Sequence, residues 1–236
     1  MNEYCYFNNE NYRFKVSDKT LELTPYTFQV NNQLWENESI EEFYKNISPN
    51  EKFNIVDIGA QSGLYTLFAK FLPNSTFYSF EPFPPTFALL NENIELNKIT
   101  NVKTFNLGIS NKKEKLTLNS CINHNGLHTM GQTPMRFSDI KPIEVDVDTL
   151  DNLFYEKNIP VHFIKIDTEG WEYNILLGGI NTIKTYKPII QLEWNETNLK
   201  QCGFESSQLE NLIKDMGYKV FKKINEELFI CPIENE

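Results

Sequence analysis

Beyond residue 50, short apolar runs alternate with helix-like segments, and this order predicts the fold. Five apolar runs have the length of buried strands, at residues 53–58, 76–80, 102–107, 161–166 and 188–193. Helix-like patterns mark four further segments, at residues 63–71, 86–97, 172–178 and 207–216. Strands that alternate with helices are typical of a mostly parallel sheet with helices on both faces. The sequence therefore predicts an α/β fold.

Two further regions complete the predicted set of strands. Residues 218–223 and 227–231, joined through Asn225, predict an antiparallel hairpin at the end of the chain. We therefore expect a seven-stranded, mostly parallel sheet that ends in an antiparallel pair. The region between the third and fourth strands is less regular. It has predicted strands at 115–118 and 142–147, with a loop containing glycine, histidine and methionine between them.

The first fifty residues predict an extension that packs on this core. Apolar and polar residues alternate over 12–30 around the polar triplet Ser17-Asp18-Lys19, which predicts a β-hairpin. Residues 39–47 predict a helix, because Ser39 and Glu42 have the spacing of a capping box. The extension would then be a hairpin followed by a helix.

Length, charge and composition narrow the class of protein. With 236 residues and 27.7 kDa, we expect a single domain over 1–236, with a hairpin and helix lid at 1–50 and an α/β core at 51–236. A net charge of −10 at pH 7 disfavours nucleic acid as a partner. No stretch approaches the roughly 18 apolar residues of a membrane span, and residues 1–11 lack the features of a secretory signal. We therefore expect an intracellular, cytoplasmic protein that does not insert into membranes.

The cysteines indicate no special chemistry. Cys5, Cys121, Cys202 and Cys231 are spread along the chain without a C-x-x-C pair, so neither a disulfide framework nor a structural metal site is predicted.

The oligomeric state stays open, because the edge of the terminal hairpin could be blunted by charge or used for pairing in a homo-oligomer.

The first candidate site is the loop between the first strand and its helix, Val56-Asp57-Ile58-Gly59-Ala60-Gln61-Ser62-Gly63. Gly59 permits a sharp turn at the strand end, and Gly63 lets the helix pack close to the sheet. Asp57 could hold the cationic amino group of a methionine moiety, directly or through water, but would repel a pyrophosphate. The loop also lacks the G-x-G-x-x-G spacing of dinucleotide sites. We count Asp57, Gly59, Ala60 and Gly63 as cofactor-binding residues.

A second candidate element lies at the ends of the next two strands. In Phe80-Glu81-Pro82, the Glu81 carboxylate could accept hydrogen bonds from ribose hydroxyls. At the tip of the third strand, Gly108 would let an adenine ring approach the backbone. We count Glu81, Pro82 and Gly108 with the cofactor-binding residues.

Ordered motifs span most of the chain beyond residue 50. They include V-D-I-G-A-Q-S-G at 56–63, F-E-P-F-P at 80–84, V-D-V-D-T-L-D at 145–151, F-I-K-I-D-T-E-G-W-E at 163–172 and I-Q-L-E-W at 190–194. In this series the chain resembles the FkbM family of methyltransferases. The resemblance implies a Rossmann-like class I methyltransferase fold and S-adenosylmethionine (SAM) as methyl donor, with S-adenosylhomocysteine (SAH) as product. It also implies a small-molecule or glycan acceptor that is methylated on a hydroxyl, for which a sugar is our favoured candidate.

The resemblance also assigns roles to residues. The residues that match the family's SAM site are Asp57, Gly59, Gly63 and Glu81. Lys165, Asp167 and Glu169 match its K-x-D-x-E-G motif at the end of the central fourth strand, where the methyl group should be presented. Glu193 matches a carboxylate that ends the next strand.

Methyl transfer is an in-line displacement that needs an aligned acceptor oxygen and a base. Either Asp167 or Glu169 could be the base, and Lys165 is a third catalytic candidate. We favour Asp167, which we also count among the cofactor-binding residues, with Glu169 bonding backbone groups near the turn. Asp167 and Glu169 would point the same way if the strand continued through both, and apart if a turn followed Asp167. Alternatively, Lys165 pairs with a carboxylate and these charges only end a buried strand. Asp167, Glu193 and a further oxygen could hold a divalent metal, but none is expected.

Other polar and aromatic residues leave alternatives open. His124 and His128 lie in the irregular loop, and His128 could act as a base because the ordinary pKa of histidine is near neutrality; a surface-loop role is the alternative. Trp171 and Trp194 could stack on the acceptor or pack in the core. A non-catalytic SAM-binding module and, more distantly, an NAD-linked oxidoreductase remain as rival functions.

Overall fold

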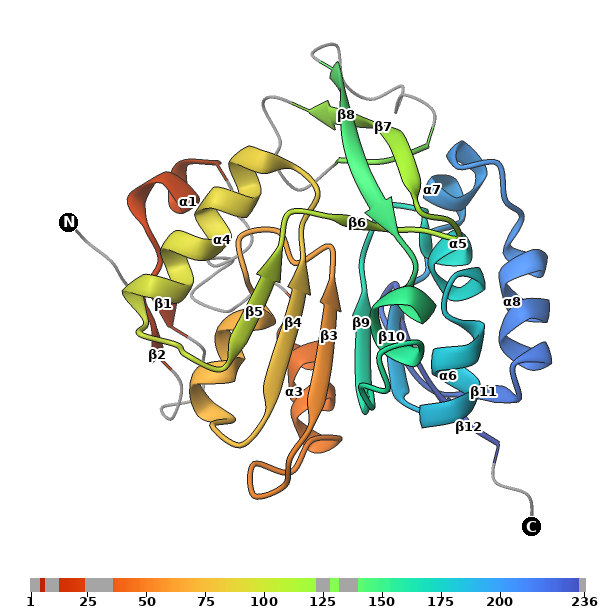
Figure 1. The fold of residues 1–236 in the computed structure, drawn as a ribbon, viewed down its shortest axis with the longest axis horizontal. Helices are drawn as coiled ribbons and strands as arrows, with labels where there is room; N and C mark the ends of the chain where they lie inside the picture. The colour runs from red at the N-terminus through yellow and green to blue at the C-terminus, as the bar shows by residue number, and fades with distance from the viewer. Residues whose placement is uncertain (1–4, 7–12, 24–35, 122–127, 132–139, 234–236) are drawn as a thin grey trace.

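The structure is a computed structural model of the chain and describes residues 5–6, 13–23, 36–121, 128–131 and 140–233. At its centre is a seven-stranded sheet in the order β11-β12-β10-β9-β3-β4-β5 (Figure 1). The strands are β3 (Asn54–Ile58), β4 (Thr76–Phe80), β5 (Val102–Phe105), β9 (Phe163–Ile166), β10 (Ile189–Glu193), β11 (Tyr218–Ile224) and β12 (Glu227–Pro232). Neighbouring strands from β5 to β10 run parallel, and β12 is antiparallel to both β10 and β11. The predicted parallel sheet with a terminal antiparallel pair is confirmed.

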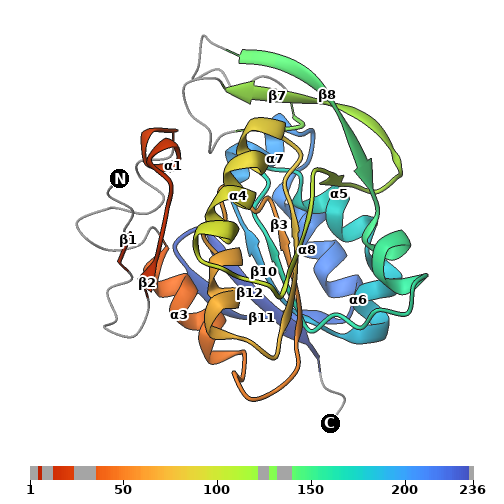
Figure 2. The same ribbon diagram turned by 60° about the vertical axis from the view of Figure 1, so that its left-hand side comes forward.

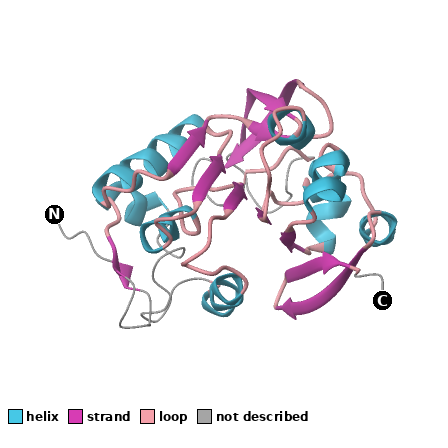
Figure 3. Ribbon diagram, turned by 60° about the horizontal axis from the view of Figure 1, so that its bottom comes forward, coloured by secondary structure: helices cyan, strands magenta, loops and turns pink. Residues whose placement is uncertain are grey.

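Helices lie on both sides of the sheet (Figure 3). They are α1 (Asp18–Leu23), α3 (Asn37–Lys45), a 3₁₀ helix (Thr66–Phe71), α4 (Pro84–Leu96), a π-helical turn (Asp151–Tyr155), α5 (Glu172–Leu177), α6 (Ile180–Tyr186), α7 (Glu196–Gln201) and α8 (Ser206–Asp215). None of the helices in the described parts of the chain has the length and apolar character that crossing a lipid bilayer requires.

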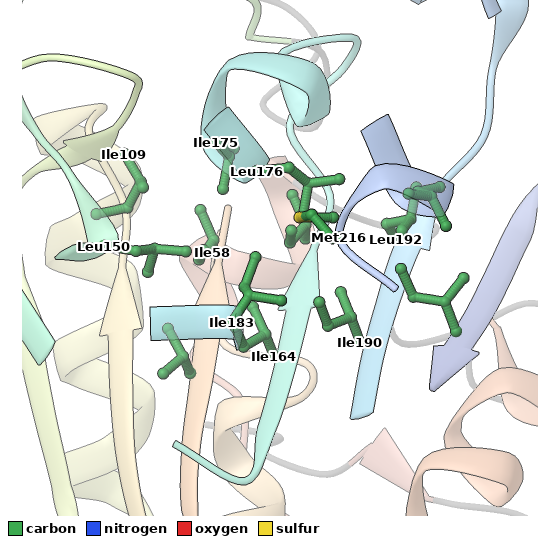
Figure 4. Packing of buried hydrophobic residues seen from close by; sticks show 14 of the residues in the cluster. Ile58, Ile109, Leu150, Ile164, Ile175, Leu176, Ile183, Ile190, Leu192 and Met216 are labelled. Carbon is green, nitrogen blue, oxygen red and sulfur yellow. The ribbon is translucent and has the colours of Figure 1, made fainter. Parts of the chain in front are cut away.

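Side chains alternate between the two faces of the sheet, as the pleat of a strand dictates. Ile58, Ile164 and Ile190 lie in one hydrophobic cluster with buried residues of α5, α6 and α8 (Figure 4). On the opposite face, Ile55 and Phe163 pack with buried residues of α3 and the 3₁₀ helix. A strand buried on both faces reads as a continuous apolar run, which explains why these strands were predictable.

A smaller mixed sheet lies at the end of the molecule toward which β3, β4 and β5 point (Figures 1 and 2). It consists of β6 (Gly108–Ile109), β8 (Ile140–Asp148) and β7 (Glu114–Cys121), in that order. The strands predicted at 115–118 and 142–147 are therefore present and longer than expected.

The N-terminal prediction is partly wrong. Residues of the expected turn begin helix α1 instead, because the Ser17 hydroxyl accepts a hydrogen bond from the Thr20 amide at 3.3 Å and so caps the helix. The strand before it, β2 (Arg13–Phe14), pairs with β1 (Cys5–Tyr6), which precedes it in the chain. The rest of the hairpin predicted over 12–30 falls at 24–30, outside the described residues.

Two other predicted details differ from the structure. The helix expected at 39–47 is α3, but it begins at Asn37, and Glu36 precedes it in a left-handed conformation. Ser39 is therefore buried in the first turn and forms no capping box. The helix expected at 63–71 is reduced to the 3₁₀ helix, and α6 and α7 were not predicted.

A buried amide joins the N-terminal segment to the core. Asn93 of α4 accepts a hydrogen bond from the Ser17 amide at 2.9 Å and donates to Thr20 Oγ1 at 3.0 Å. It also donates to the carbonyl of Ser62 at 2.8 Å. One side chain thus fixes the start of α1 against the loop that follows β3.

Candidate active site

The loop after β3 is held close to the ends of two neighbouring strands. The amides of Gly59 and Ala60 both donate to the carbonyl of Phe80, at 3.1 and 3.0 Å. Gly59 has a φ of 75°, and a Cβ there would overlap the carbonyl oxygen of Asp167. At Gly63, with a φ of 105°, a Cβ would lie 2.9 Å from the Leu90 side chain. The sharp turn predicted at Gly59 is present, whereas the close packing at Gly63 is against α4 and not, as predicted, against the sheet.

Glu81 directly follows β4 and lies beside this loop. Its buried carboxylate accepts hydrogen bonds from the amides of Gln61 at 3.0 Å and Phe83 at 2.8 Å. Burial raises the pKa of Glu81 to about 7, against the effect of these two donors. Asn106, after β5, donates to the carbonyls of Glu81 and Pro82 at 2.8 and 2.9 Å and fixes the strand end. Glu81 and the loop therefore form one hydrogen-bonded unit.

A row of polar side chains crosses the buried centre of the sheet. Asp57, Lys165 and Gln191 are register partners on adjacent strands β3, β9 and β10. Asp57 Oδ2 accepts from Thr66 Oγ1 at 2.6 Å, and Lys165 Nζ donates to Asp167 Oδ2 at 2.9 Å. Burial lowers the pKa of Lys165, but the surrounding carboxylates, led by Asp167, outweigh burial and raise it. Lys165 is thus a permanent cation that positions Asp167.

The N-terminal extension adds an unpredicted carboxylate to this row. Glu36 Oε2 accepts from the Tyr65 hydroxyl at 3.1 Å, and Gln191 Nε2 donates to the same hydroxyl at 2.6 Å. Gln191 Nε2 also donates to Glu227 Oε2 at 3.1 Å. Burial, followed by the charge of Asp167, raises the pKa of Glu36 to about 7.

Three carboxylates converge where β9 and β10 end. One carboxylate oxygen each from Asp167, Glu169 and Glu193 lies within 4.8 Å of the others. A turn does follow Asp167, but Glu169, at a φ of 54°, brings its side chain back toward Asp167. The Glu169 carboxylate accepts from Asn198 Nδ2 at 2.7 Å. Burial, then the charge of Asp167, raises the pKa of Glu169 to about 8 and that of Glu193 well above its ordinary range.

Comparison with known proteins places this geometry in a family. Residues 57–220 match the family model described as the methyltransferase FkbM domain. The chain belongs to this family. The matched region contains the loop after β3, Glu81 and all three carboxylates at the ends of β9 and β10.

Two similar proteins are fungal methyltransferases. Methyltransferase 1 of Beauveria bassiana (strain ARSEF 2860) is 30% identical over 148 residues, which cover 55% of this chain and 59% of that protein. The chain thus spans little more than half the length of this relative. Methyltransferase sdnD of Sordaria araneosa is 24% identical over 196 residues, covering 70% of this chain and 73% of that protein.

Among solved structures, the precorrin-6y C5,15-methyltransferase of Geobacter metallireducens GS-15 is similar, with a TM-score of 0.50 and 12% identity. The match covers 89% of this chain and 94% of that one, and it supports the class I methyltransferase fold. The methyltransferase FkbM of Methylobacillus flagellatus KT matches with a TM-score of 0.48 and 18% identity, over 78% of this chain and 45% of that one.

One expected role in the FkbM motif belongs to a different residue. Glu172, and not Glu169, bonds the backbone of the turn: its Oε1 accepts from the amides of Thr168 at 3.1 Å and Gly170 at 3.4 Å. The same oxygen accepts from the Thr168 hydroxyl at 2.8 Å. The signal in the sequence is an acidic residue in the first turn of a helix, two residues after a glycine.

The remaining predicted residues lie around this centre. The His128 ring packs on Phe83 with centroids 4.2 Å apart, and burial lowers the pKa of His128 to about 4, so the imidazole is neutral at pH 7. A Cβ on Gly108 would lie 2.6 Å from the Met130 side chain, so the chain itself packs closely there. Trp171 donates to Ser110 Oγ at 3.2 Å, and Trp194 is partly buried against the core. Both tryptophans fit the core-packing alternative, and His124 lies outside the described residues.

Proposed function

We propose that this chain is a SAM-dependent O-methyltransferase that acts on a hydroxyl of a small molecule or glycan, with a sugar as the favoured acceptor. One observation carries the proposal: the loop after β3, Glu81 and Asp167 meet at the same edge of the parallel sheet, tied by backbone hydrogen bonds. The Gly59 amide bonds β4, and the Asp167 amide donates to the carbonyl of Ile58 on β3 at 3.1 Å. Membership of the FkbM family supports the same function.

The residues present fit SAM. Asp57 Oδ1 is buried and has no hydrogen-bond partner among the described residues, so it can accept from the ammonium of a methionine moiety, directly or through water. Glu81, once ionised, would accept hydrogen bonds from ribose hydroxyls. The backbone at Gly59 and Gly63 adopts conformations that glycine supplies at no steric cost. These residues would hold the cofactor with its methionine part toward Asp167.

Asp167 has the geometry of a general base. Its Oδ2 is bound to Lys165 at 2.9 Å, while its side chain keeps 28% of its exposure, so Oδ1 can accept the proton of the acceptor hydroxyl. When bound, SAM supplies a methyl carbon that forms a bond to that oxygen, while the C–S bond breaks and its electron pair stays on sulfur as SAH. Lys165 orients the carboxylate and balances its charge. Proton removal of this kind contributes about 10²- to 10⁴-fold in rate.

Charge supports the choice of acceptor class. The chain carries a net charge of −10, and carboxylates from several elements surround the site. A polyanion such as nucleic acid would be repelled by this field, whereas a neutral hydroxylated molecule would not.

The test is transfer of a labelled methyl group from SAM to a panel of sugars and other hydroxylated small molecules, read out as labelled product and SAH. We expect product with at least one hydroxyl acceptor, and loss of it in Asp167→Asn. Glu144→Gln, at an exposed carboxylate paired with Lys115, is the matched control and should keep full activity. Methylation only of amines, or of no acceptor by a chain that binds SAM, would overturn the proposal.

A further inference from the structure

Asp167 belongs to two groups of carboxylates at the ends of the strands. The inner group consists of Glu36, Asp167 and Glu227, and the outer group of Asp167, Glu169 and Glu193. Within each group, one oxygen from every residue lies within 4.8 Å of the others. Like charges this close repel strongly unless cations, hydrogen-bond donors or protons compensate them.

The inner group is compensated by the protein itself. Burial raises the pKa of both Glu36 and Glu227, and the charge of Lys165, which binds Asp167, opposes this rise. The Tyr65 hydroxyl donates to Glu36, and the Gln191 amide donates to Glu227. A cation and two donors therefore serve these three carboxylates.

The outer group shares the Lys165 ion pair through Asp167, but its other two carboxylates receive less compensation. Glu169 receives one hydrogen bond, from Asn198. Glu193 is partly buried, but its Oε2 has no contact with solvent and no hydrogen-bond partner among the described residues. An orphaned buried carboxylate oxygen is costly unless a cation or a proton accompanies it. This oxygen is the second observation, beside the acidic cluster itself, that indicates a ligand.

We propose that Asp167, Glu169 and Glu193 form a binding site for one divalent cation with a preference for oxygen ligands, such as Mg²⁺ or Mn²⁺. Such ions bind carboxylate oxygens at about 2.0 to 2.6 Å, so ligands on opposite sides of one ion are roughly 4 to 5 Å apart. The 4.8 Å limit within the outer group meets this requirement. The ligand set contains no imidazole or thiolate, which disfavours zinc and other softer metals.

The place of this site suggests what the cation does, a role that rests on the proposed function. The three carboxylates leave coordination positions for acceptor oxygens. A bound cation would lower the pKa of a coordinated hydroxyl and so share with Asp167 the task of ionising it. The acceptor class then narrows to molecules with two neighbouring oxygens, such as the vicinal diol of a sugar.

Binding of Mn²⁺ to the chelator-treated, desalted protein tests the site without SAM or acceptor. The readout is the electron paramagnetic resonance signal of free Mn²⁺. We expect one Mn²⁺ per chain, displaced by Mg²⁺. Glu193→Gln and Glu169→Gln should each weaken binding at least about tenfold, since even residues behind metal ligands have effects of 10- to 100-fold. Glu144→Gln, outside the site, should bind as the wild type does.

The outcomes separate this inference from the proposed function. If the wild type takes up no Mn²⁺ at millimolar concentration but binds SAH, the cation site is wrong and the proposed function stands. If Mn²⁺ is bound but SAH is not, the proposed function is wrong and the cation site stands. Mn²⁺ binding lost in Glu227→Gln and retained in Glu193→Gln would place the ion in the inner group and overturn the assignment. A circular dichroism spectrum like that of the wild type confirms that each variant folds.

Discussion

Replacing Gly59 with alanine tests the close approach between the cofactor loop and the end of β9. Gly59 has a φ of 75°, a conformation that costs an L-residue about 1–2 kcal/mol. The added Cβ would overlap the Asp167 carbonyl oxygen and lie 3.0 Å from its carbon. Overpacking against backbone adds about 1–3 kcal/mol. We therefore expect Gly59→Ala to lower the free energy of unfolding by about 2–5 kcal/mol.

Gly217→Ala is a matched control. Gly217 has a φ of 78°, and nothing lies within 4 Å of a Cβ added there. This variant should lose only the backbone contribution of about 1–2 kcal/mol. Urea unfolding followed by circular dichroism measures both variants, and the difference corresponds to roughly 2–12 °C in Tm for a domain of this size.

The comparison also has a functional readout. Gly59→Ala should weaken SAH binding, because the loop and Asp167 must move apart to admit the methyl group, whereas Gly217→Ala should bind SAH normally. Equal losses of stability in the two variants would refute the close approach between Gly59 and Asp167 on which the site geometry depends.

Three further predictions concern the cofactor acid, the base and the extension. The Glu81 pKa is about 7, and ribose hydroxyls need the ionised carboxylate, so calorimetry should show SAM binding about tenfold more weakly at pH 6 than at pH 8. In Glu81→Gln this pH dependence of SAM binding should vanish. If the pH dependence persisted in that variant, another group would be responsible for it. Asp167→Asn should lower kcat about 10²- to 10⁴-fold while SAM affinity is kept, and normal turnover would rule Asp167 out as the base. Phe43→Ala should lower the free energy of unfolding, measured with denaturant, by about 3–5 kcal/mol. The reason is that Phe43 is fully buried and its ring centroid lies 5.0 Å from that of Phe163. A loss below about 1 kcal/mol would mean that α3 is not packed on the sheet.

The core of the fold was predictable because its strands are buried on both faces. β4 has the bounds predicted for it, and β3 and β10 differ from theirs by one residue, since continuous apolar runs leave few alternatives. The triplet at Ser17 was ambiguous, because a serine before polar residues suits a turn and a helix cap equally well. The Asn93 side chain that stabilises the helix lies far away in sequence and gives no local signal.

The candidate site, like the fold, could be predicted from the sequence only in part. Asp57, Glu81 and Asp167 could be found because each lies next to the end of a predictable strand. Glu36 and Glu227 could not, because they join the site through Tyr65 and Gln191 across long separations in sequence. The exchange of roles between Glu169 and Glu172 depends on a left-handed φ at Glu169, which no pattern of polar and apolar residues encodes.

The most direct test of the central claim, that the strand ends of this chain bind SAM, is thermal unfolding in the presence of SAM, SAH or NADH. At about 100 times the dissociation constant, binding to the native state adds roughly 2.7 kcal/mol, which raises the Tm of a domain of this size by about 5–11 °C. We predict this shift with SAM and with SAH, and none with NADH. No shift with either SAM or SAH, or a shift with NADH alone, would contradict the account.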